Sequence, residues 1–210
     1  HDGMIYLKLN GKASAIPTDF NDLTFRQYLD IRAIPNTKLI DIAAYFTGFS
    51  VEALMASTEV ENFYIIIDGL SWVLGEPALE ANYRPATIRC ADVTYNIPNT
   101  IDRCTVAQFE DVRAIMLLSQ QDNKLGVDIY PKIIAVFIAP VIFGKYDSDT
   151  YEKTVPIIEG LTVPEVIGLG NFFVMKFSDL SNGIIAGLPR RATIWKRLMR
   201  VLNNWRHGGF

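Results

Sequence analysis

The sequence predicts an α+β protein that is predominantly α-helical, with two pseudo-repeats followed by a basic C-terminal helix. Each pseudo-repeat is expected to contain a β-hairpin, a capped helix and a small helical bundle. Three observations support this prediction: residues 97–115 repeat residues 16–34 at a constant offset of 81, alternating apolar segments precede both copies, and helix-capping sequences recur along the chain. We therefore expect a first repeat at 1–78, a second, longer repeat at 79–183 and the basic amphipathic helix at 184–210.

The two copies of the repeat are identical at eight of nineteen aligned positions, and four further positions stay apolar. The identities include Thr24 with Thr105 and Gln27 with Gln108, and the spacing Thr-x-x-Gln is a capping box that starts a helix. They also include two pairs of charged side chains, which are either solvated helix charges or one interdomain contact used twice. These pairs are Asp30/Asp111 and Arg32/Arg113.

The first repeat begins with an alternating apolar segment that leads to Asn10-Gly11, a strong hairpin turn sequence. The capping box at Thr24 then starts a helix that Pro35 ends, and the next helix stops at Gly48. The elements expected in this repeat are a hairpin at 4–17 and helices at 25–34, 39–47, 50–55 and 58–75, the last opened by the capping box Thr58-x-x-Glu61.

The second repeat is expected to begin as the first does, after a connector at 77–85. Its elements are a hairpin at 87–97 that turns at Ala91-Asp92, helices at 106–119, 129–143 and 151–158, and a helix from the capping box Thr162-x-x-Glu165 to Ser181. Pro140 is expected to kink or end its helix. Because this repeat is longer than the first by 23 residues, we place an insertion within 119–161.

No catalytic constellation is expected, because the two histidines, His1 and His207, stand at the ends of the chain. Neither cysteine can be given a nearby base, and Cys90 and Cys104 are expected to be free thiols, although the sequence leaves a single disulfide open. The spacing of a metal site is also missing. We therefore expect no enzyme activity, no metal, no cofactor and no small-molecule substrate.

Three stretches that resemble functional motifs have simpler interpretations. Asp147-Ser148-Asp149 lacks the rest of a calcium loop and is interpreted as a solvated turn. Gly168-Leu169-Gly170 lacks the context of a phosphate loop and indicates close helix packing. The most apolar run, at 133–143, is too short to span a membrane, which needs about 20 apolar residues, so a buried core helix is expected.

The C-terminal stretch differs in charge from the rest of the chain. No acidic residue follows Asp179, and six basic residues give this stretch +6, whereas residues 1–179 carry −9 from 14 basic and 23 acidic residues. The stretch is predicted to be a basic amphipathic helix that docks on its own acidic body, on a protein partner, or on a membrane or nucleic-acid surface. We expect the principal partner contact at Arg190, Arg191, Trp195, Arg197, Leu198, Arg200 and Trp205.

A short hairpin, then Leu-Thr-Phe-Arg-Gln-Tyr at 23–28, compact apolar helices and a second copy of the unit together resemble small virion-assembly proteins of tailed bacteriophages, especially tail assembly chaperones. The resemblance implies a non-catalytic protein that holds an aggregation-prone or elongated structural protein during assembly in the host cytoplasm. It further implies that an apolar helical surface and the basic C-terminal helix make the contacts.

Two alternatives stay open beside the chaperone hypothesis. The internal duplication equally suits a structural component of the phage particle, such as a connector, ring or tail protein, which would place the chain in the virion. The other alternative is a small enzyme with an unrecognised carboxylate site. The expected partner is a virion structural protein or a second copy of the chain, and neither nucleic acid nor a membrane span is expected.

Overall fold

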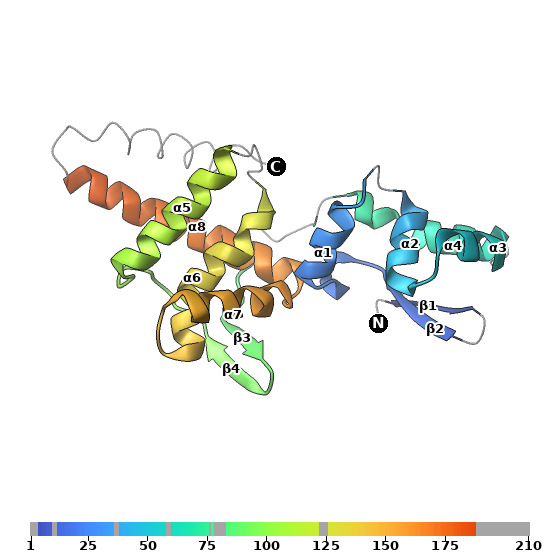
Figure 1. Ribbon diagram of the computed structural model, residues 1–210, viewed down its shortest axis with the longest axis horizontal. Coiled ribbons are helices and arrows are strands. Elements are labelled where there is room, and N and C mark those ends of the chain that lie inside the picture. Colours follow the sequence, from blue (N-terminus) through green and yellow to red (C-terminus); the bar gives the residue numbers. More distant parts are fainter. Residues whose placement is uncertain are drawn as a thin grey trace. The chain divides into compact units, whose positions relative to one another are not determined.

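The computed structural model describes residues 4–9, 12–35, 38–57, 60–75, 77, 83–121 and 126–187 (Figure 1). The chain is mainly helical with two small antiparallel sheets of two strands each, which confirms the predicted α+β, predominantly α-helical class. It divides into two compact units, residues 1–81 with 159–164 and residues 82–158 with 165–210. The boundary predicted from the sequence lies after residue 78, and residues 159–164 were expected to belong with the second repeat.

The first unit contains the predicted hairpin and the predicted capped helix. Strands β1 (Met4–Leu9) and β2 (Lys12–Pro17) pair antiparallel. The helical elements that follow are η1 (Phe20–Asp22), α1 (Phe25–Arg32), α2 (Leu39–Thr47), α3 (Val51–Ser57), α4 (Val60–Gly69) and η2 (Ser71–Leu74). Gly48 ends α2 in the left-handed conformation with φ 66°, as predicted. The capping residue predicted at Thr58 lies outside the described residues.

The last helix of the first repeat was predicted to continue to Gly75. This predicted end is wrong, because α4 ends at Gly69 and the short 3-10 helix η2 follows. The helix end lies directly against strand β1: a Cβ atom at Gly69 would stand 2.2 Å from Cδ1 of Ile5. Glycine permits this close approach and also weakens the helix at the same position.

The core of the first unit forms where the hairpin meets the helices. Its fully buried side chains come from strand, turn and helix alike: Ile16, Leu23, Phe25, Ile42, Leu54 and Leu70. A hydrogen bond from Oγ of Ser14 to the carbonyl of Thr47, at 3.1 Å, ties β2 to α2. Helix α2 thus packs against strand β2 on one side and against α3 and α4, which places it in the middle of this unit's core.

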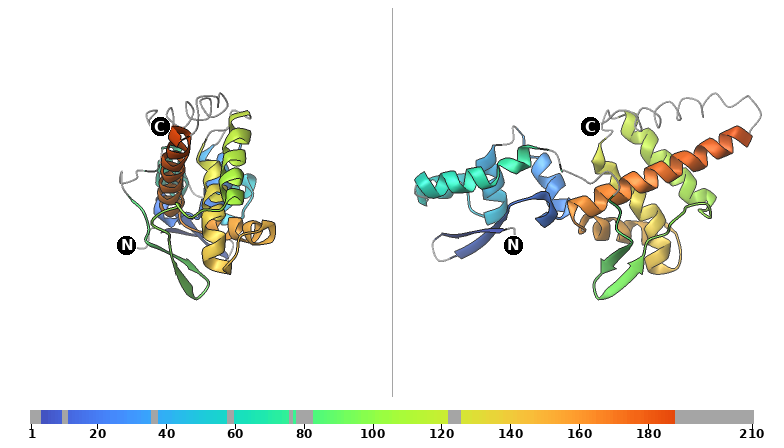
Figure 2. Two further views of the ribbon diagram at one scale, coloured as in Figure 1. Left: turned by 90° about the vertical axis from the view of Figure 1, so that its left-hand side faces the viewer. Right: turned by 180° about the vertical axis from the view of Figure 1, so that it is seen from behind.

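The second unit begins with the hairpin β3 (Thr87–Cys90) and β4 (Val93–Asn96), which projects from the helices of this unit (Figure 2). The helical elements are α5 (Val106–Gln121), η3 (Val127–Ile129), α6 (Tyr130–Phe143), α7 (Ser148–Glu159) and α8 (Val163–Gly187). Three of these helices extend beyond their predicted ends: α5 passes residue 119, α7 begins before residue 151, and α8 passes residue 181. None of the residues at the predicted ends is a helix breaker, so the helical hydrogen bonds continue.

Helix α6 forms the core of the second unit, which confirms the predicted buried helix. All seven residues from 133 to 139 are buried. The ring of Phe137 stacks on that of Phe173 in α8 with 4.9 Å between centroids, and Phe109 of α5 lies 4.9 Å from Phe177 of α8. Within the described part of the chain, no single helix combines the length and the apolar composition needed to cross a membrane.

The two hairpins share one register at the offset of 81. Tyr6 pairs with Ala15 in the first sheet, and Thr87 pairs with Asn96 in the second, so the pairs correspond residue for residue. The other pairs of β3 and β4 match pairs of β1 and β2 in the same way. The structural repeat therefore includes the hairpins, although sequence identity is concentrated in the turn and the helix that follow them.

Replacing Thr24 or Thr105 by alanine is expected to lower the free energy of unfolding by about 1 kcal/mol and to leave the fold intact. Each hydroxyl accepts a backbone N–H in the first turn of its helix, and alanine leaves that N–H unpaired. Urea denaturation followed by circular dichroism measures the loss. Serine at the same position keeps the acceptor and serves as the control, so a serine variant as unstable as the alanine variant would contradict the capping role.

Candidate binding groove at the second capping box

Both predicted capping boxes are present and have nearly the same geometry. In the first unit, the amide of Gln27 donates to Oγ1 of Thr24 at 3.2 Å, and the amide of Thr24 donates to Oε1 of Gln27 at 3.0 Å. In the second unit, the corresponding distances between Thr105 and Gln108 are 3.3 Å and 2.9 Å. The prediction that these residues start α1 and α5 is confirmed.

Gln108 has a second role that the sequence analysis missed. Its Nε2 donates to the carbonyl of Val136 at 2.8 Å, and the Gln108 side chain is only 6% exposed. In a regular helix that carbonyl would accept the N–H four residues later, which is the position of Pro140 and has no N–H. Gln108 supplies the missing donor, so α6 continues past Pro140 to Phe143, which is the predicted end of the helix. Of the two effects expected of Pro140, ending the helix does not occur.

The repeated aspartates bind tyrosines of their own units. The hydroxyl of Tyr45 in α2 donates to Asp30 at 2.9 Å, and the hydroxyl of Tyr146, between α6 and α7, donates to Asp111. Burial and the bond to Asp30 raise the pKa of Tyr45 to about 12, and the pKa of Tyr146 is raised for the same two reasons. Each aspartate thus holds its capped helix to a later segment of the same unit, a contact that neither earlier interpretation included.

The repeated arginines also interact within their own helices. Nη1 of Arg32 donates to the hydroxyl of Tyr28 at 2.7 Å, and Arg113 forms an ion pair with Glu110. The interpretation as helix charges therefore suits the arginines better than it suits the aspartates.

A groove of about 540 Å³ lies beside the second capping box. Its lining comes from the segment before α5, the first turns of α5 and the C-terminal end of α6: Pro98, Thr100, Ile101, Arg103, Cys104, Thr105, Gln108, Phe137, Pro140, Val141, Gly144, Lys145 and Tyr146. Apolar atoms make up most of the surface, and two cationic side chains, Arg103 and Lys145, supply the charge. An apolar concave surface with a few polar groups is the usual form of a binding site.

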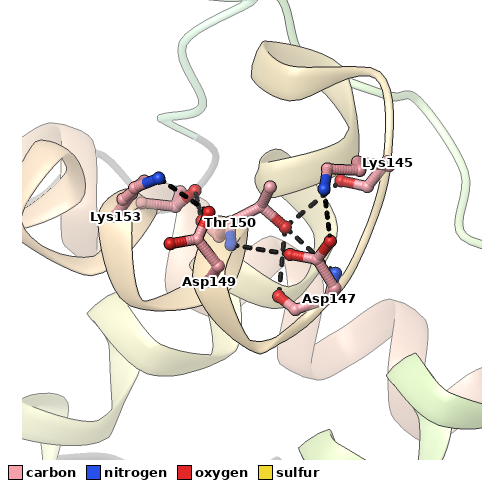
Figure 3. Close-up of polar contacts among 6 residues, drawn as sticks. Lys145, Asp147, Asp149, Thr150 and Lys153 are labelled. Carbon is pink, nitrogen blue, oxygen red and sulfur yellow. Dashed lines mark hydrogen bonds and ion pairs between the residues drawn. The ribbon is translucent and has the colours of Figure 1, made fainter.

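The two cationic side chains of the groove differ in ion pairing. Nζ of Lys145 lies 2.7 Å from Oδ2 of Asp147 (Figure 3), and this pairing raises the pKa of Lys145. Arg103 is exposed and has no acidic partner among the described residues. The groove therefore presents a guanidinium group at Arg103 that forms no ion pair within the described residues, which favours an acidic ligand group.

Asp147-Ser148-Asp149 begins helix α7. The amide of Thr150 donates to Oδ1 of Asp147 at 2.9 Å, and the amide of Asp147 donates to Oγ1 of Thr150 at 3.0 Å (Figure 3), so the two side chains form a further capping box. Asp149 pairs with Lys153 one turn later at 2.6 Å. These contacts explain why the helix begins earlier than predicted.

Acidification from pH 4 to pH 2 is expected to weaken the first turn of α7. The ion pair with Lys145 and the bonds from Thr150 lower the pKa of Asp147 from 3.8 to about 2, so their stabilisation is complete above pH 4 and is lost as the carboxylate protonates toward pH 2. A carbon-13 NMR titration of the Asp147 carboxyl group measures this pKa. Lys145→Met should raise it, and an unchanged value would contradict the ion pair as its main cause.

The cysteines are free and partly buried, as predicted, since neither forms a disulfide. Burial, followed by the nearby charge of Asp102, raises the pKa of Cys104. The thiol of Cys104 in the groove is therefore protonated at neutral pH and is a poor nucleophile.

The predicted close packing at Gly168-Leu169-Gly170 is confirmed. A Cβ atom at Gly168 would stand 2.5 Å from the carbonyl oxygen of Tyr83, and one at Gly170 would stand 2.1 Å from Cδ2 of Tyr130. Both glycines of α8 thus lie against neighbouring segments of the second unit, in positions that any side chain would obstruct.

The residues predicted to contact a partner lie outside the described part of the chain, which ends at residue 187. They are Arg190, Arg191, Trp195, Arg197, Leu198, Arg200 and Trp205. The groove is the candidate site within the described residues, and sequence reasoning missed it because Val136 and Pro140 meet Gln108 only in the folded chain. Comparisons of the chain with protein families, with curated proteins and with solved structures find no match.

Proposed function

We propose that the chain is a non-catalytic protein-binding protein that acts in virion or tail assembly, in the manner of a tail assembly chaperone. The observation that carries this proposal is the exposure of large apolar side chains along the consecutive helical elements α3, α4 and η2. Met55 and Tyr64 are each 66% exposed, Ile65 is 59% exposed and Leu74 is 64% exposed. Large apolar side chains that remain in water on one stretch of a fold are typical of interaction surfaces.

The polar side chains also favour binding over catalysis. Asp30 and Asp111 accept tyrosine hydroxyls, and Asp147 caps a helix, so structural contacts account for these carboxylates. A small enzyme with an unrecognised carboxylate site is kept as an alternative. A thermal-shift screen against nucleotides and divalent metal ions distinguishes the two, because a binding protein of this kind should gain no stability from either.

A structural role in the particle is the alternative that the duplication favours. Two hairpins in the same register, each followed by the same capped helix, give one chain two similar building units. A connector, ring or tail protein can use such units for repeated contacts with its neighbours. The chaperone hypothesis differs from this alternative in one respect, namely that a chaperone is absent from finished particles.

Photo-crosslinking tests the proposal. A photoreactive amino acid at Tyr64 should crosslink, in cells that make the protein, to a virion structural protein identified by mass spectrometry. The same group at Lys132, an exposed polar position of α6 in the second unit, is the control and should crosslink much less. The crosslinked product in purified particles would favour the structural alternative, and equal labelling from Tyr64 and Lys132 would contradict a specific apolar contact.

Deleting residues 190–210 is expected to leave the melting temperature nearly unchanged and to abolish partner binding. The physical reason is that this segment has a net charge of +6 and three large apolar side chains, Trp195, Leu198 and Trp205, whereas residues 1–179 have a net charge of −9. Binding of the intact chain should weaken as ionic strength rises past about 0.15 M. A deletion variant that melts at lower temperature would mean that the segment docks on its own body, and one that still binds fully would exclude it as the partner contact.

A further inference from the structure

The turn before α1 holds an extended segment of the first unit. The amide of Phe25 donates to the carbonyl of Leu161 at 2.8 Å, and the amide of Val163 donates to the carbonyl of Leu23 at 3.1 Å. These two bonds form an antiparallel bridge centred on Thr24 and Thr162. The side chains of Leu161 and Val163 are buried, so the edge of the first capping box is a docking position for an extended apolar segment.

The corresponding edge in the second unit is open. At the offset of 81, Leu23 and Phe25 correspond to Cys104 and Val106. Within the described part of the chain, no group bonds to the carbonyl of Cys104 or to the amide of Val106. The Phe25 side chain is completely buried, whereas that of Val106 is 80% exposed. The second copy of the unit therefore exposes the backbone groups that the first copy uses to hold residues 161–163.

The groove lies at this open edge. Seven of its thirteen lining residues belong to the repeated stretch 97–115, and they include Cys104, Thr105 and Gln108 of the capping box. An unpaired amide in the first turn of a helix would by itself be ordinary. Here it is accompanied by an apolar groove and by an equivalent position in the same chain that already binds a segment.

We propose that this groove binds an extended segment of a partner protein, paired with Cys104 and Val106 as residues 161–163 are paired with Leu23 and Phe25. An apolar side chain of the segment occupies the groove, and an acidic side chain of the segment binds Arg103. The inference rests on the proposed protein-binding function and specifies the kind of partner sequence: short, extended, apolar on alternate residues, and acidic.

Charge distinguishes this partner from other occupants. In the first unit, Arg26 binds Glu159 of the docked segment at 3.0 Å. In the second copy, Ala107 occupies the position of Arg26, and Arg103 occupies the position of Asp22. Both copies therefore have an arginine near the capping box, four positions earlier in the second copy than in the first. The chain's own residues 188–210 contain no acidic side chain to bind Arg103. A second copy of the chain is also disfavoured, because its segment 161–163 is already used in its own first unit.

A synthetic peptide with the sequence of residues 157–165, Ile-Ile-Glu-Gly-Leu-Thr-Val-Pro-Glu, is the probe. The peptide contains residues 161–163, which pair with Leu23 and Phe25 in the first unit, together with two acidic side chains. Titration of the nitrogen-15-labelled full chain should shift the amide resonances of residues 98–108 and 137–146. Shifts confined to residues 17–27 would mean exchange with the chain's own segment and would overturn the proposal, as would no shift at about 1 mM peptide.

Val106→Pro tests the backbone bond directly. Proline at the first helical position is compatible with the helix and removes only the N–H that the segment needs, and the exposed side chain makes no packing contribution. We expect peptide binding to weaken about five-fold relative to Val106→Ala, with the circular dichroism spectrum unchanged. Equal affinity in these two variants would overturn the proposal.

Arg103→Glu tests the charge. It should weaken peptide binding several-fold, whereas Lys132→Glu, the same change at an exposed position of α6 outside the groove, should leave binding unchanged. Equal effects of the two variants would exclude a specific contact at Arg103. If the peptide binds the groove but no virion protein crosslinks at Tyr64, the proposed function fails and this inference stands. If a virion protein crosslinks at Tyr64 but the peptide does not bind, only the proposed peptide binding in the groove is refuted.

Discussion

Gly170→Ala is expected to lower the free energy of unfolding by about 3 kcal/mol, because the added methyl group has no room. A Cβ atom at this position would stand 2.1 Å from Cδ2, 2.2 Å from Cγ and 2.8 Å from Cβ of Tyr130. The ring of Tyr130 is 1% exposed, and its hydroxyl donates to Oδ1 of Asn171 at 2.6 Å, so it cannot move aside without breaking that bond. Helices α6 and α8 would have to separate instead.

Gly183→Ala is the matched control on the same helix. Nothing lies within 4 Å of a Cβ atom at Gly183, and alanine is the better helix former, so this variant should be more stable than the wild type by up to about 1 kcal/mol. Urea denaturation of both variants measures the difference. If Gly170→Ala were as stable as Gly183→Ala, the packing of α6 against α8 would be contradicted.

Local features of this fold were predictable because each depends on a few consecutive residues. Thr24 and Thr105 lie three residues before a glutamine, which is enough to place two helix starts. Gly48 ends α2 for an equally local reason, and the turn Ala91-Asp92 lies between two alternating segments. The constant offset of 81 then extends these local results to the whole unit.

Contacts between distant residues were not predictable, because the sequence does not contain the distance between their elements. Gln108 and Val136 are 28 positions apart, and Asp111 and Tyr146 are 35 apart. For the same reason, the pairing of residues 161–163 with the turn before α1 was not predicted. An indirect sign was available for one of them: a proline inside an apolar helix leaves the carbonyl four residues earlier without its usual donor, and a buried carbonyl needs another one.

The candidate site illustrates the same limit. The partner contact was predicted in the basic C-terminal stretch, since charge and amphipathic pattern can be read from consecutive residues. The groove has no such pattern, because its lining comes from two segments, 98–108 and 137–146. The ligand proposed for the groove follows from the structure of the first unit, where Leu23 and Phe25, which correspond to Cys104 and Val106, pair with residues 161–163.

Gln108→Leu is expected to lower the free energy of unfolding by about 3 kcal/mol, through the loss of hydrogen bonds at both the oxygen and the nitrogen of the side-chain amide. Oε1 of Gln108 accepts the amide of Thr105 at 2.9 Å, and Nε2 donates to the carbonyl of Val136 at 2.8 Å. A buried carbonyl left without a donor costs about 1 to 3 kcal/mol, and the lost cap adds about 1 kcal/mol. Gln27→Leu, the matched variant in the first unit, loses the capping bond and should cost only about 1 kcal/mol.

Pro140→Ala should reduce the cost of Gln108→Leu by about 1 to 2 kcal/mol, because it restores an N–H four residues after Val136. In the double variant that N–H can donate to the carbonyl of Val136 as in a regular helix, so only the capping bond of Thr105 remains lost. The double-mutant cycle is measured by urea denaturation of the wild type, the two single variants and the double variant. If Gln108→Leu cost the same with proline as with alanine at position 140, the bond to Val136 would contribute nothing, and Gln108 would stabilise the second unit through its capping box alone.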